Sequence, residues 1–184
     1  MDKNKVNFNK NFDLFIYTVG HSNHKIERFI ELLTSHNISC ILDVRSIPYS
    51  KHNRDFEKNN LSSELLCNGI EYVWMGETLG GRRHQFKSSL GFRQDDRYDS
   101  DPDYTRGVLE LVHKALTKPT ALMCSEEDPR RCHRHKIIAH TLLNKKIPEL
   151  DQQFDNIKIT HIRANGRLED ASLIEIYFQP SLFE

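Results

Sequence analysis

The chain has 184 residues, a length that predicts one compact domain and argues against two full ones. It carries 26 Lys and Arg against 26 Asp and Glu, so its formal net charge of zero excludes attraction to nucleic acid or membranes through overall charge. No apolar run approaches the roughly 20 residues of a membrane-spanning helix, and the first dozen residues lack the apolar core of a signal peptide. We therefore expect a cytoplasmic protein without a membrane partner, in which any basic site is local.

The four cysteines are too few and too unevenly spaced for a disulfide scaffold, so we expect free thiols. Cys40 lies in an apolar run and Cys67 follows two leucines, and both are interpreted as buried core residues. Cys124 and Cys132 lie in a polar segment, where metal binding or chemistry is the alternative to packing.

The first part of the chain alternates between strand and helix patterns. Residues 1–12, rich in Asn and Lys, are expected to form a flexible tail before a single domain over 13–184. Leu14–Val19 is a short apolar run that predicts a buried strand. Helical spacing follows from 25 to about 37, and Ile38–Val44 predicts a second buried strand.

The middle of the chain continues this alternation around one long loop. A helix around Leu61–Leu66 is closed by Asn68-Gly69, and Ile70–Met75 follows as the third strand. The stretch 79–102 has no core pattern, which predicts a long loop with the character of a functional lid. Tyr104–Leu116 is the next predicted helix, and Thr120–Cys124 is the fourth strand.

The last part predicts a helix and two more strands. Asp128-Pro129 is an N-cap followed by proline, so a single helix is expected from there to about Asn144. Ile157–Ile162 predicts a fifth strand, residues 164–166 a turn, and Leu173–Phe178 a sixth strand. The pattern predicts an α/β fold: three layers, with a mostly parallel sheet of five or six strands and helices on both faces.

Ligands of an open α/β sheet bind beyond the carboxyl ends of its strands, so polar residues at these ends are the first candidates for a site. Such residues follow four predicted strands and begin the helix after the fourth: His21, Ser22, Asp43, Arg45, Ser46, Glu77, Gly80, Gly81, Cys124, Glu126, His133 and Arg134. We predict that six of them surround one concave site: His21, Asp43, Arg45, Glu77, Cys124 and His133. Three further histidines have positions compatible with surface exposure and are assigned no role: His135, His140 and His161.

The segment Cys124–Arg134 holds the densest group of reactive side chains. Cys124 and Arg130 have the C-x5-R spacing with which phosphatase-type and sulfurtransferase-type loops present a thiolate to an oxyanion. Three consecutive acids, residues 126–128, follow the cysteine, and their charge would repel a phosphate and raise the pKa of the thiol. The sequence therefore disfavours a phosphatase-like mechanism.

A second interpretation of the same segment is a zinc site. Thiolate and imidazole suit zinc, so Cys124, Cys132 and His133 would be ligands, with His21 as the fourth. The Cys-x7-Cys spacing lacks the tight chelating pair of most zinc sites, and adjacent helical residues such as Cys132 and His133 point in different directions. We therefore predict no cofactor, and zinc is the minority alternative.

A third interpretation concerns the long loop. Aromatic residues of this loop would stack on the bases of a nucleic acid. Four basic residues around them would contact its phosphates: Arg82, Arg83, Lys87 and Arg93. Five aspartates between 95 and 103 dilute this positive charge. If nucleic acid is a partner, we expect it to bind through these four residues of the loop.

Four ordered motifs resemble the signature of the domain-of-unknown-function family DUF488. They are Thr18-Val-Gly-His-Ser22, Leu42-Asp-Val-Arg-Ser46, Gly76-Glu-Thr-Leu-Gly-Gly81 and Cys124-Ser-Glu-Glu-Asp-Pro-Arg-Arg-Cys-His-Arg134. The resemblance covers roughly residues 17–162 and implies a small, stand-alone prokaryotic α/β protein with no activity attached to the family as a whole. A weaker likeness is to the rhodanese group, which has a similar hydrophobic-Asp-Val-Arg strand and a cysteine after a later strand. The acidic loop after Cys124 departs from that group's pattern.

The leading hypothesis is a small enzyme that acts on an anionic or nucleotide-like substrate at the carboxyl edge of the sheet. Its catalytic candidates are His21, Asp43, Glu77, Cys124, Glu126 and His133, and its substrate-binding candidates are Ser22, Arg45, Ser46, Gly80, Gly81 and Arg134. In this hypothesis the arginines bind the anion, His133 or Glu77 transfers protons, and Cys124 is the nucleophile. The alternative is a nucleotide or nucleic-acid binding module without catalysis.

Glu126 decides between the roles that Cys124 can have. A carboxylate beside an oxyanion opposes its binding through like-charge repulsion. We predict instead that Glu126 turns inward and pairs with Arg45 or Arg134 as an orienting group or general base. The site would then prefer a substrate with hydrogen-bond donors beside its anionic part.

Overall fold

The structure is a computed structural model, and it describes residues 13–49, 53–81, 98, 101–144 and 147–174. The tail predicted over 1–12 lies outside these residues, as do most of the loop predicted over 79–102 and its four basic residues. Within the described ranges, no helix combines the length and the apolar character needed to cross a membrane. The described residues have the predicted α/β architecture.

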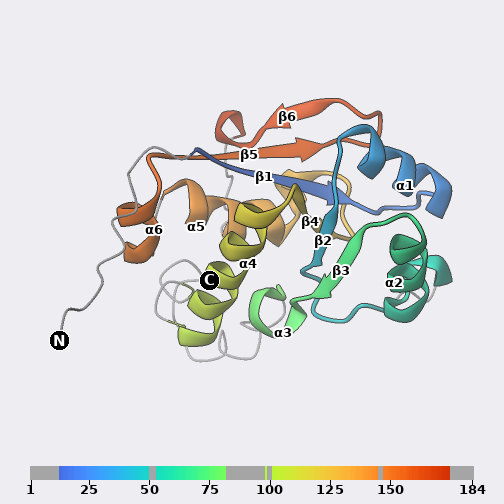
Figure 1. Cartoon of the computed structure of the whole chain (residues 1–184), viewed down its shortest axis with the longest axis horizontal. Helices are drawn as coiled ribbons and strands as arrows, with labels where there is room; N and C mark the ends of the chain where they lie inside the picture. Colours follow the sequence, from blue (N-terminus) through green and yellow to red (C-terminus); the bar gives the residue numbers. More distant parts are fainter. Residues whose placement is uncertain (1–12, 50–52, 82–97, 99–100, 145–146, 175–184) are drawn as a thin grey trace, which may run out of the picture.

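A sheet runs through the centre of the described chain, with the strand order β3-β2-β4-β1-β5-β6 (Figure 1). The strands are β1 Asp13–Gly20, β2 Cys40–Asp43, β3 Glu71–Trp74, β4 Thr120–Cys124, β5 Asn156–Ile162 and β6 Leu168–Asp170. The strands β1 to β5 are parallel to one another, whereas β6 is antiparallel to β5. The mostly parallel sheet is therefore confirmed, and the carboxyl ends of β2, β4 and β1 lie at one edge.

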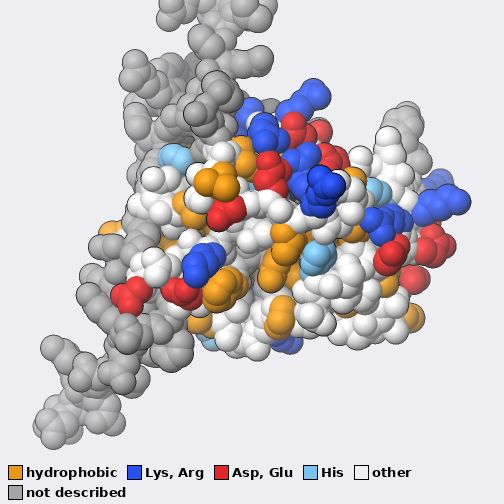
Figure 2. All heavy atoms as spheres, turned by 90° about the horizontal axis from the view of Figure 1, so that it is seen from above, with side chains coloured by type: hydrophobic (Ala, Val, Ile, Leu, Met, Phe, Trp, Pro, Cys, Tyr) orange, Lys and Arg blue, Asp and Glu red, His pale blue; other side chains and the backbone are white. Residues whose placement is uncertain are grey.

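Charged side chains of both signs cover the edge of the sheet at β6. Arg163, which follows β5, pairs with Glu169 of β6 and with Glu127, whose carboxylate is 2.8 Å from the guanidinium. Arg130 pairs with Glu169 at 2.7 Å. Figure 2 views the molecule from this side and shows basic and acidic side chains intermingled. Paired charges on a short edge strand oppose edge-to-edge association with another sheet.

Helices cover both faces of the sheet. On one face lie α1 Ile26–Ser35, the 3-10 turn η1 Arg54–Phe56 and α2 Lys58–Cys67. On the other face lie α3 Gly76–Leu79, α4 Pro102–Thr117, the π-helical turn η4 Arg134–Ala139, α5 His140–Leu143, α6 Pro148–Gln153 and the 3-10 turn η5 Ala171–Leu173. The 3-10 turn η3 Pro129–Arg131 follows β4. The result is the predicted three-layer arrangement.

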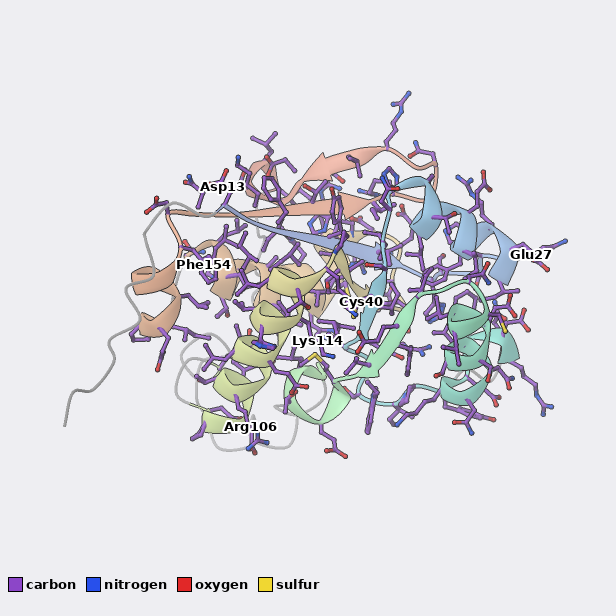
Figure 3. The ribbon with its side chains drawn as sticks, in the orientation of Figure 1. Asp13, Glu27, Cys40, Arg106, Lys114 and Phe154 are labelled. Carbon is purple, nitrogen blue, oxygen red and sulfur yellow. The ribbon has the colours of Figure 1, made fainter. Side chains whose placement is uncertain are left out.

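Helix α4 illustrates how the sequence sets these elements. The Asp101 carboxylate accepts a hydrogen bond from the Asp103 N–H at 3.0 Å, and Pro102 occupies the first helical position, so the helix has a well-formed N-cap. Arg106 lies on the outer side of the helix, and Lys114 reaches the Glu71 carboxylate of β3 at 2.6 Å (Figure 3). The opposite side of α4 is apolar and faces the sheet.

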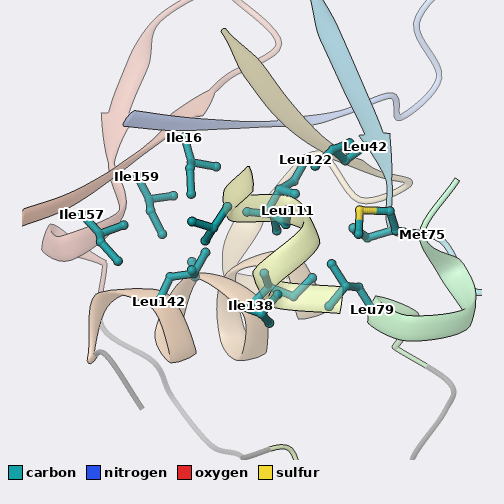
Figure 4. Close-up of a cluster of buried hydrophobic side chains, with 14 of the residues drawn as sticks. Ile16, Leu42, Met75, Leu79, Leu111, Leu122, Ile138, Leu142, Ile157 and Ile159 are labelled. Carbon is teal, nitrogen blue, oxygen red and sulfur yellow. The ribbon is translucent and has the colours of Figure 1, made fainter. Parts of the chain in front are cut away.

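Apolar side chains from the strands and from α4, η4 and α5 interlock in the larger of two cores (Figure 4). Ile16, Leu122 and Ile159 point down from the sheet, and Leu111 and Ile138 meet them from the helices. The second core lies on the other face, where α1 and α2 bury their apolar sides. These two cores fix the strands and so fix the positions of the residues at their carboxyl ends.

The last third of the described chain contains one wrong prediction and one strand that was not predicted. The single helix expected from Asp128 to Asn144 is interrupted at Cys132, between η3 and the helical stretch of η4 and α5. The sixth strand of the sheet is Leu168–Asp170. Of the strand predicted at Leu173–Phe178, the first residue ends η5, and residues 175–178 lie outside the described chain. The predicted turn at 164–166, in which Gly166 has φ +82°, reverses the chain directly after β5. The strand that follows such a tight turn pairs with β5 in the antiparallel direction.

Candidate functional site

An open cleft of about 610 Å³ lies at the carboxyl ends of β2 and β4. Its lining comes from the segment after β2, the segment after β4, the turn that follows η3, and one glycine: Arg45, Ser46, Ile47, Tyr49, Gly81, Cys124, Ser125, Glu126, Arg131, Cys132 and His133. A volume of this size accommodates a small metabolite or a mononucleotide. The cleft lies where the topology predicts a ligand site.

Two sulfur atoms and one imidazole nitrogen meet in this cleft. The Nδ1 atom of His133 lies 3.8 Å from the Sγ of Cys124 and 3.9 Å from the Sγ of Cys132. All three atoms lie within 4.8 Å of one another. The Nε2 atom of His133 is 3.0 Å from the backbone carbonyl of Val44, which can only accept, so Nε2 carries the hydrogen. The Nδ1 atom of His133 therefore faces the two sulfurs.

The break in the predicted helix brings Cys132 and His133 together. Cys132 has extended backbone angles, φ −119° and ψ 141°, whereas His133 is already helical, with φ −62° and ψ −24°. Two residues in different conformations can direct their side chains to one point, which adjacent residues of a helix cannot do. The sequence argument that these two side chains diverge is therefore wrong, because it assumed a continuous helix.

The two cleft thiols influence each other's ionisation. Burial by itself raises the pKa of the Cys132 thiol, but hydrogen bonds with Cys124 and His133 and the positive charge of Arg134 outweigh burial, so this pKa lies well below its usual value. The pKa of Cys124 is raised by its hydrogen bond to Cys132, by burial and by the charge of Cys132. The pair therefore favours one thiolate, at Cys132, beside one thiol.

The carbonyl groups of residues 124–127 all point toward the β1 side of the loop. The first two accept hydrogen bonds from the backbone N–H groups of His21 and Ser22, each at 2.9 Å, directly after β1. The last two accept from the guanidinium of Arg134, which also bonds to Thr18 of β1 at 3.2 Å. Four successive carbonyls are thus held on the side away from β2.

This arrangement turns backbone N–H groups toward the cleft. The described peptide bonds are trans, so each N–H points opposite to the carbonyl of the preceding residue. The N–H groups of Ser125 and Glu126, the two loop residues after Cys124 that line the cleft, therefore point to the β2 side of the loop, where Arg45 also lines it. Successive N–H groups that face one concavity form a binding site for an anion.

The three acids after Cys124 do not act together. The Glu127 carboxylate pairs with Arg163 on the far side of the loop, and Asp128 accepts a hydrogen bond from the Arg130 N–H at 3.0 Å as the cap of η3. Glu126 is exposed beside the cleft, and its bond to Arg134 is made by its backbone carbonyl. Within the described chain its carboxylate pairs with no arginine, so the predicted inward pairing is wrong. The Arg134 guanidinium instead donates to the backbone carbonyls of residues 126 and 127.

Asp43, Arg45 and His21 form a closed polar cluster behind the cleft. The Arg45 guanidinium donates to the Asp43 carboxylate at 2.6 to 3.1 Å and to the His21 Nε2 at 3.2 Å, and Tyr72 donates to Asp43 at 2.7 Å. Burial and the positive charge of Arg45 lower the pKa of His21 to about 4, so its ring is neutral at pH 7. His21 Nδ1 bonds to the Ser22 carbonyl at 2.9 Å, which leaves neither ring nitrogen for a ligand.

The two arginines predicted to bind an anion have internal partners instead. Arg45 is 4% exposed and Arg134 is 1% exposed, and their guanidinium groups bond to Asp43 and to loop carbonyls. Arg131, which the prediction omitted, is exposed on the cleft and has no ion-pair partner among the described residues. Arg130, the arginine of the C-x5-R spacing, pairs with Glu169 outside the cleft. The only sequence signal for Arg131 is its place directly before Cys132.

A buried chain of hydrogen bonds supports Arg134 from behind. Thr18 Oγ1, which Arg134 contacts, is 2.7 Å from Nδ1 of His161, and Nε2 of His161 is 3.0 Å from Nδ1 of His135. Burial and nearby His135 and Arg134 lower the pKa of His161 to about 3. Both histidines are buried, so the expectation that they are compatible with surface exposure is wrong.

The remaining predicted residues lie at different distances from the cleft. Ser46 and Gly81 line it, and Gly80 packs against Ser46. Ser22 lies behind the loop after β4, and its backbone holds the Ser125 carbonyl. Glu77 is exposed on α3 and does not line the cleft. Of the six residues predicted to surround one site, Arg45, Cys124 and His133 line the cleft, while His21 and Asp43 support it.

The other two cysteines lie away from the cleft. All four cysteines are free thiols, as predicted. Cys40 is buried at the start of β2, near Lys114 and at the opposite end of the strand from the cleft (Figure 3). Cys67 is exposed, so its predicted burial is wrong. Helical periodicity explains this, because Leu61 and Leu65 face the core and Cys67 falls on the outer side of α2.

Comparisons with known proteins identify one family. No curated protein and no solved structure matched the chain, and no comparison supports the likeness to the rhodanese group. The sequence model of a family described as "Domain of unknown function DUF488" matches residues 25–142, which include β2, β4 and the cleft residues of both segments. The match covers more than half of the chain, and the chain therefore belongs to the DUF488 family.

Proposed function

We propose that this protein is an enzyme that acts on a small anionic or nucleotide-like substrate, with Cys124, Cys132 and His133 as its reactive centre. One observation carries the proposal: the two sulfurs and the imidazole meet within 4.8 Å at a cleft into which the next loop directs its backbone N–H groups. Reactive groups and anion-binding groups in one cleft are the combination that catalysis on an anion requires.

The preference for an anion rests on two features of the cleft. Backbone N–H groups of residues 125 and 126 supply partial positive charge at fixed positions, and Arg131 supplies a full charge at the rim. Glu126 lies at the same rim and would accept hydrogen bonds from the substrate. A molecule with an anionic group beside hydrogen-bond donors, as in a nucleotide, matches these features.

The apolar part of the lining supports a substrate with an unsaturated or apolar portion. Ile47 and Tyr49 are 56% and 62% exposed, yet both line the cleft. An aromatic ring at the mouth of an anion site offers a stacking surface for a planar group such as a base. A nucleotide would thus place its anionic part at the loop and its ring at Tyr49.

The cleft contains a thiol, that of Cys132, which forms a thiolate more readily than the buried thiol of Cys40. Cys132 has a lowered pKa and adjoins His133, whereas Cys40 has a pKa raised by burial. A thiolate is a far better nucleophile than a thiol, so covalent chemistry on the substrate would begin at the cleft pair. A binding module without catalysis, the alternative function, needs the N–H groups and Arg131 but not these thiols.

The preference for anions can be tested by alkylation. Metal-free protein, kept in a chelator, is treated with iodoacetate or with neutral iodoacetamide, and mass spectrometry gives the rate at each cysteine. We expect the rate ratio of iodoacetate to iodoacetamide to be about tenfold higher at the cleft thiols than at exposed Cys67, because the cleft attracts the carboxylate. Arg131→Gln should lower this ratio, and the neighbouring Arg130→Gln should not. Equal ratios at all cysteines would refute the proposed anion site.

Turnover separates the enzyme from the binding module. A panel of nucleotides and phosphorylated metabolites is incubated with a hundredfold smaller amount of protein, and products are followed by phosphorus NMR and chromatography. We expect one member to be consumed by the wild type and left intact by Cys124→Ser and Cys132→Ser, which should still bind it. Binding that survives in all variants without consumption by the wild type would favour the non-catalytic module.

A further inference from the structure

We propose that Cys124, Cys132 and His133 bind a zinc ion through three protein ligands and leave its fourth coordination position open to the cleft. The ion would bind whether or not the cleft turns over a substrate, so this inference goes beyond the proposed function. It reverses the sequence-based preference for a site without a cofactor, because the contact between Cys132 and His133 removes the main objection.

The distances between the three donor atoms match tetrahedral zinc. With Zn–S of about 2.3 Å and Zn–N of about 2.05 Å, a tetrahedral ion needs about 3.6 Å between sulfur and nitrogen and about 3.8 Å between the sulfurs. The His133 Nδ1 atom is 3.8 and 3.9 Å from the two sulfurs, and the sulfurs lie within 4.8 Å of each other. The sulfur–nitrogen distances need shifts of a few tenths of an ångström, and the sulfur–sulfur distance needs a shift of at most about 1 Å.

The imidazole is already oriented as a ligand. Its Nε2–H donates to the Val44 carbonyl at 3.0 Å, which is the bond that fixes the tautomer and ring position of most metal-binding histidines. Gly81 lies against the ring, because a Cβ atom at this position would be 2.8 Å from the His133 Cγ. The ring therefore has little freedom to turn its Nδ1 atom away from the sulfurs.

The two sulfur ligands are held by the backbone. Cys124 ends β4 in register with Gly20, and its carbonyl bonds to the His21 N–H. The Cys132 N–H donates to the Pro129 carbonyl at 3.0 Å, and its own carbonyl accepts from the first turn of η4. A metal site whose ligands are fixed before binding loses little conformational entropy on binding.

The fourth position belongs to the cleft rather than to His21. Both ring nitrogens of His21 have partners, the Ser22 carbonyl and Arg45, so this residue is not a ligand. The three ligands all line the cleft beside Arg131. Two thiolates balance the charge of Zn²⁺, and three protein ligands with an open position are typical of catalytic rather than structural zinc. Water or an anionic atom of the substrate would occupy that position.

Metal binding can be measured without a substrate. Metal-free wild type and the variants Cys124→Ser, Cys132→Ser and His133→Gln are titrated with Zn²⁺ against a chromophoric chelator, and with Co²⁺ followed by absorption spectroscopy. Cys67→Ser is the matched control, because Cys67 is exposed on α2 and away from the cleft. Circular dichroism verifies that each variant is folded before its titration is used.

We expect one Zn²⁺ per chain in the wild type and in Cys67→Ser, and an affinity at least about 100-fold lower in each ligand variant. Co²⁺ should give thiolate-to-metal charge transfer in the ultraviolet and intense visible bands of a tetrahedral ion. Absence of stoichiometric zinc binding, a cobalt spectrum without thiolate bands, or an equal loss in Cys67→Ser would overturn the proposal. The alkylation rates are measured on metal-free protein, so they test the anion site independently of zinc binding.

Discussion

The carboxyl ends of β2 and β4 lie side by side and are equally rich in polar residues, but they are organised in opposite ways. After β2, Asp43 and Arg45 are almost fully buried and bond to each other, to His21 and to Tyr72. After β4, the side chains of residues 124–126 line a cleft, and the backbone of this segment is held from behind by Arg134. The polar groups after β2 bond to one another, whereas those after β4 face the cleft.

This difference shows that a polar residue at a strand end can have either of two functions. A guanidinium that has already found buried acceptors contributes little to a ligand, since binding would have to break those bonds. It can instead hold the backbone that binds the ligand, as Arg134 holds residues 126 and 127. The residues that act are then the neighbours whose reactive or charged atoms face the cleft, here the two cysteines, His133 and Arg131.

The largest expected effect is loss of the buried pair after β2. Asp43→Ala leaves the Arg45 charge buried without its partner and should lower the free energy of unfolding by about 3 to 5 kcal/mol in urea titrations. The double variant Asp43→Ala/Arg45→Met should lose less than the single variant, since it removes both charges. Glu31→Gln, which breaks an exposed pair with Arg28, is the control and should change stability little. A single variant as stable as wild type would contradict the supporting role.

The next effect concerns the residue that holds the reactive loop. Arg134→Lys cannot reach two carbonyls and Thr18 at once, so the free energy of unfolding should fall by about 2 kcal/mol. Because the loop carbonyls set the direction of its N–H groups, the preference of the cleft thiols for iodoacetate should fall as well. Arg130→Lys is the neighbouring control. An unchanged alkylation preference in a folded Arg134→Lys protein would show that Arg134 only stabilises the fold.

A third prediction separates the site from the fold. Gly81→Ala places a Cβ atom against the His133 ring and should weaken zinc binding about tenfold while the melting temperature stays within a few degrees of wild type. Gly69→Ala should do the opposite, because Gly69 has φ +71° with open space around it and lies outside the cleft. It should lower stability and leave the zinc affinity unchanged. Equal zinc affinities in both variants would argue against the clamped imidazole.

The smallest effect is the pH dependence of stability that comes from His161. Its pKa is about 3 in the folded protein, below the ordinary value near 6.5, so the unfolded chain binds the proton first as the pH falls. Stability from this residue is therefore present above about pH 6.5 and is lost toward pH 3, by about 1 kcal/mol between pH 7 and pH 5.5. Urea titrations of wild type and His161→Asn should differ in this slope, and parallel curves would exclude His161 as its source.

The sequence predicts the frame of the fold because local pattern and tertiary packing agree there. Thr120–Cys124 is found with the predicted bounds, and the helix predicted at Tyr104–Leu116 extends by two residues at its start and one at its end, from Pro102 to Thr117. Buried parallel strands are apolar throughout, and their helices have one apolar side, so both leave a clear pattern.

The details of the site depend on contacts that no local pattern encodes. Asp128-Pro129 is a correct signal for the start of a helix, yet the chain leaves the helical conformation at Cys132. His133 then reaches the Val44 carbonyl, 89 residues earlier in the chain. In the same way, the sequence places Arg45 and Arg134 near the strand ends, but only the folded chain reveals that their donors already have partners.

The position of β1 in the sheet has a consequence for the order in which the molecule is made. β1 lies between β4 and β5, so both of its hydrogen-bonding neighbours come from the second half of the chain. During synthesis the first strand must wait for residues 120–162 before it can pair. The loop after β4 takes its shape from contacts with β1 and Arg134, so the two cleft thiols assume their native surroundings only after β1 and β4 have paired. Their reactivity therefore reports this long-range pairing in a growing or refolding chain.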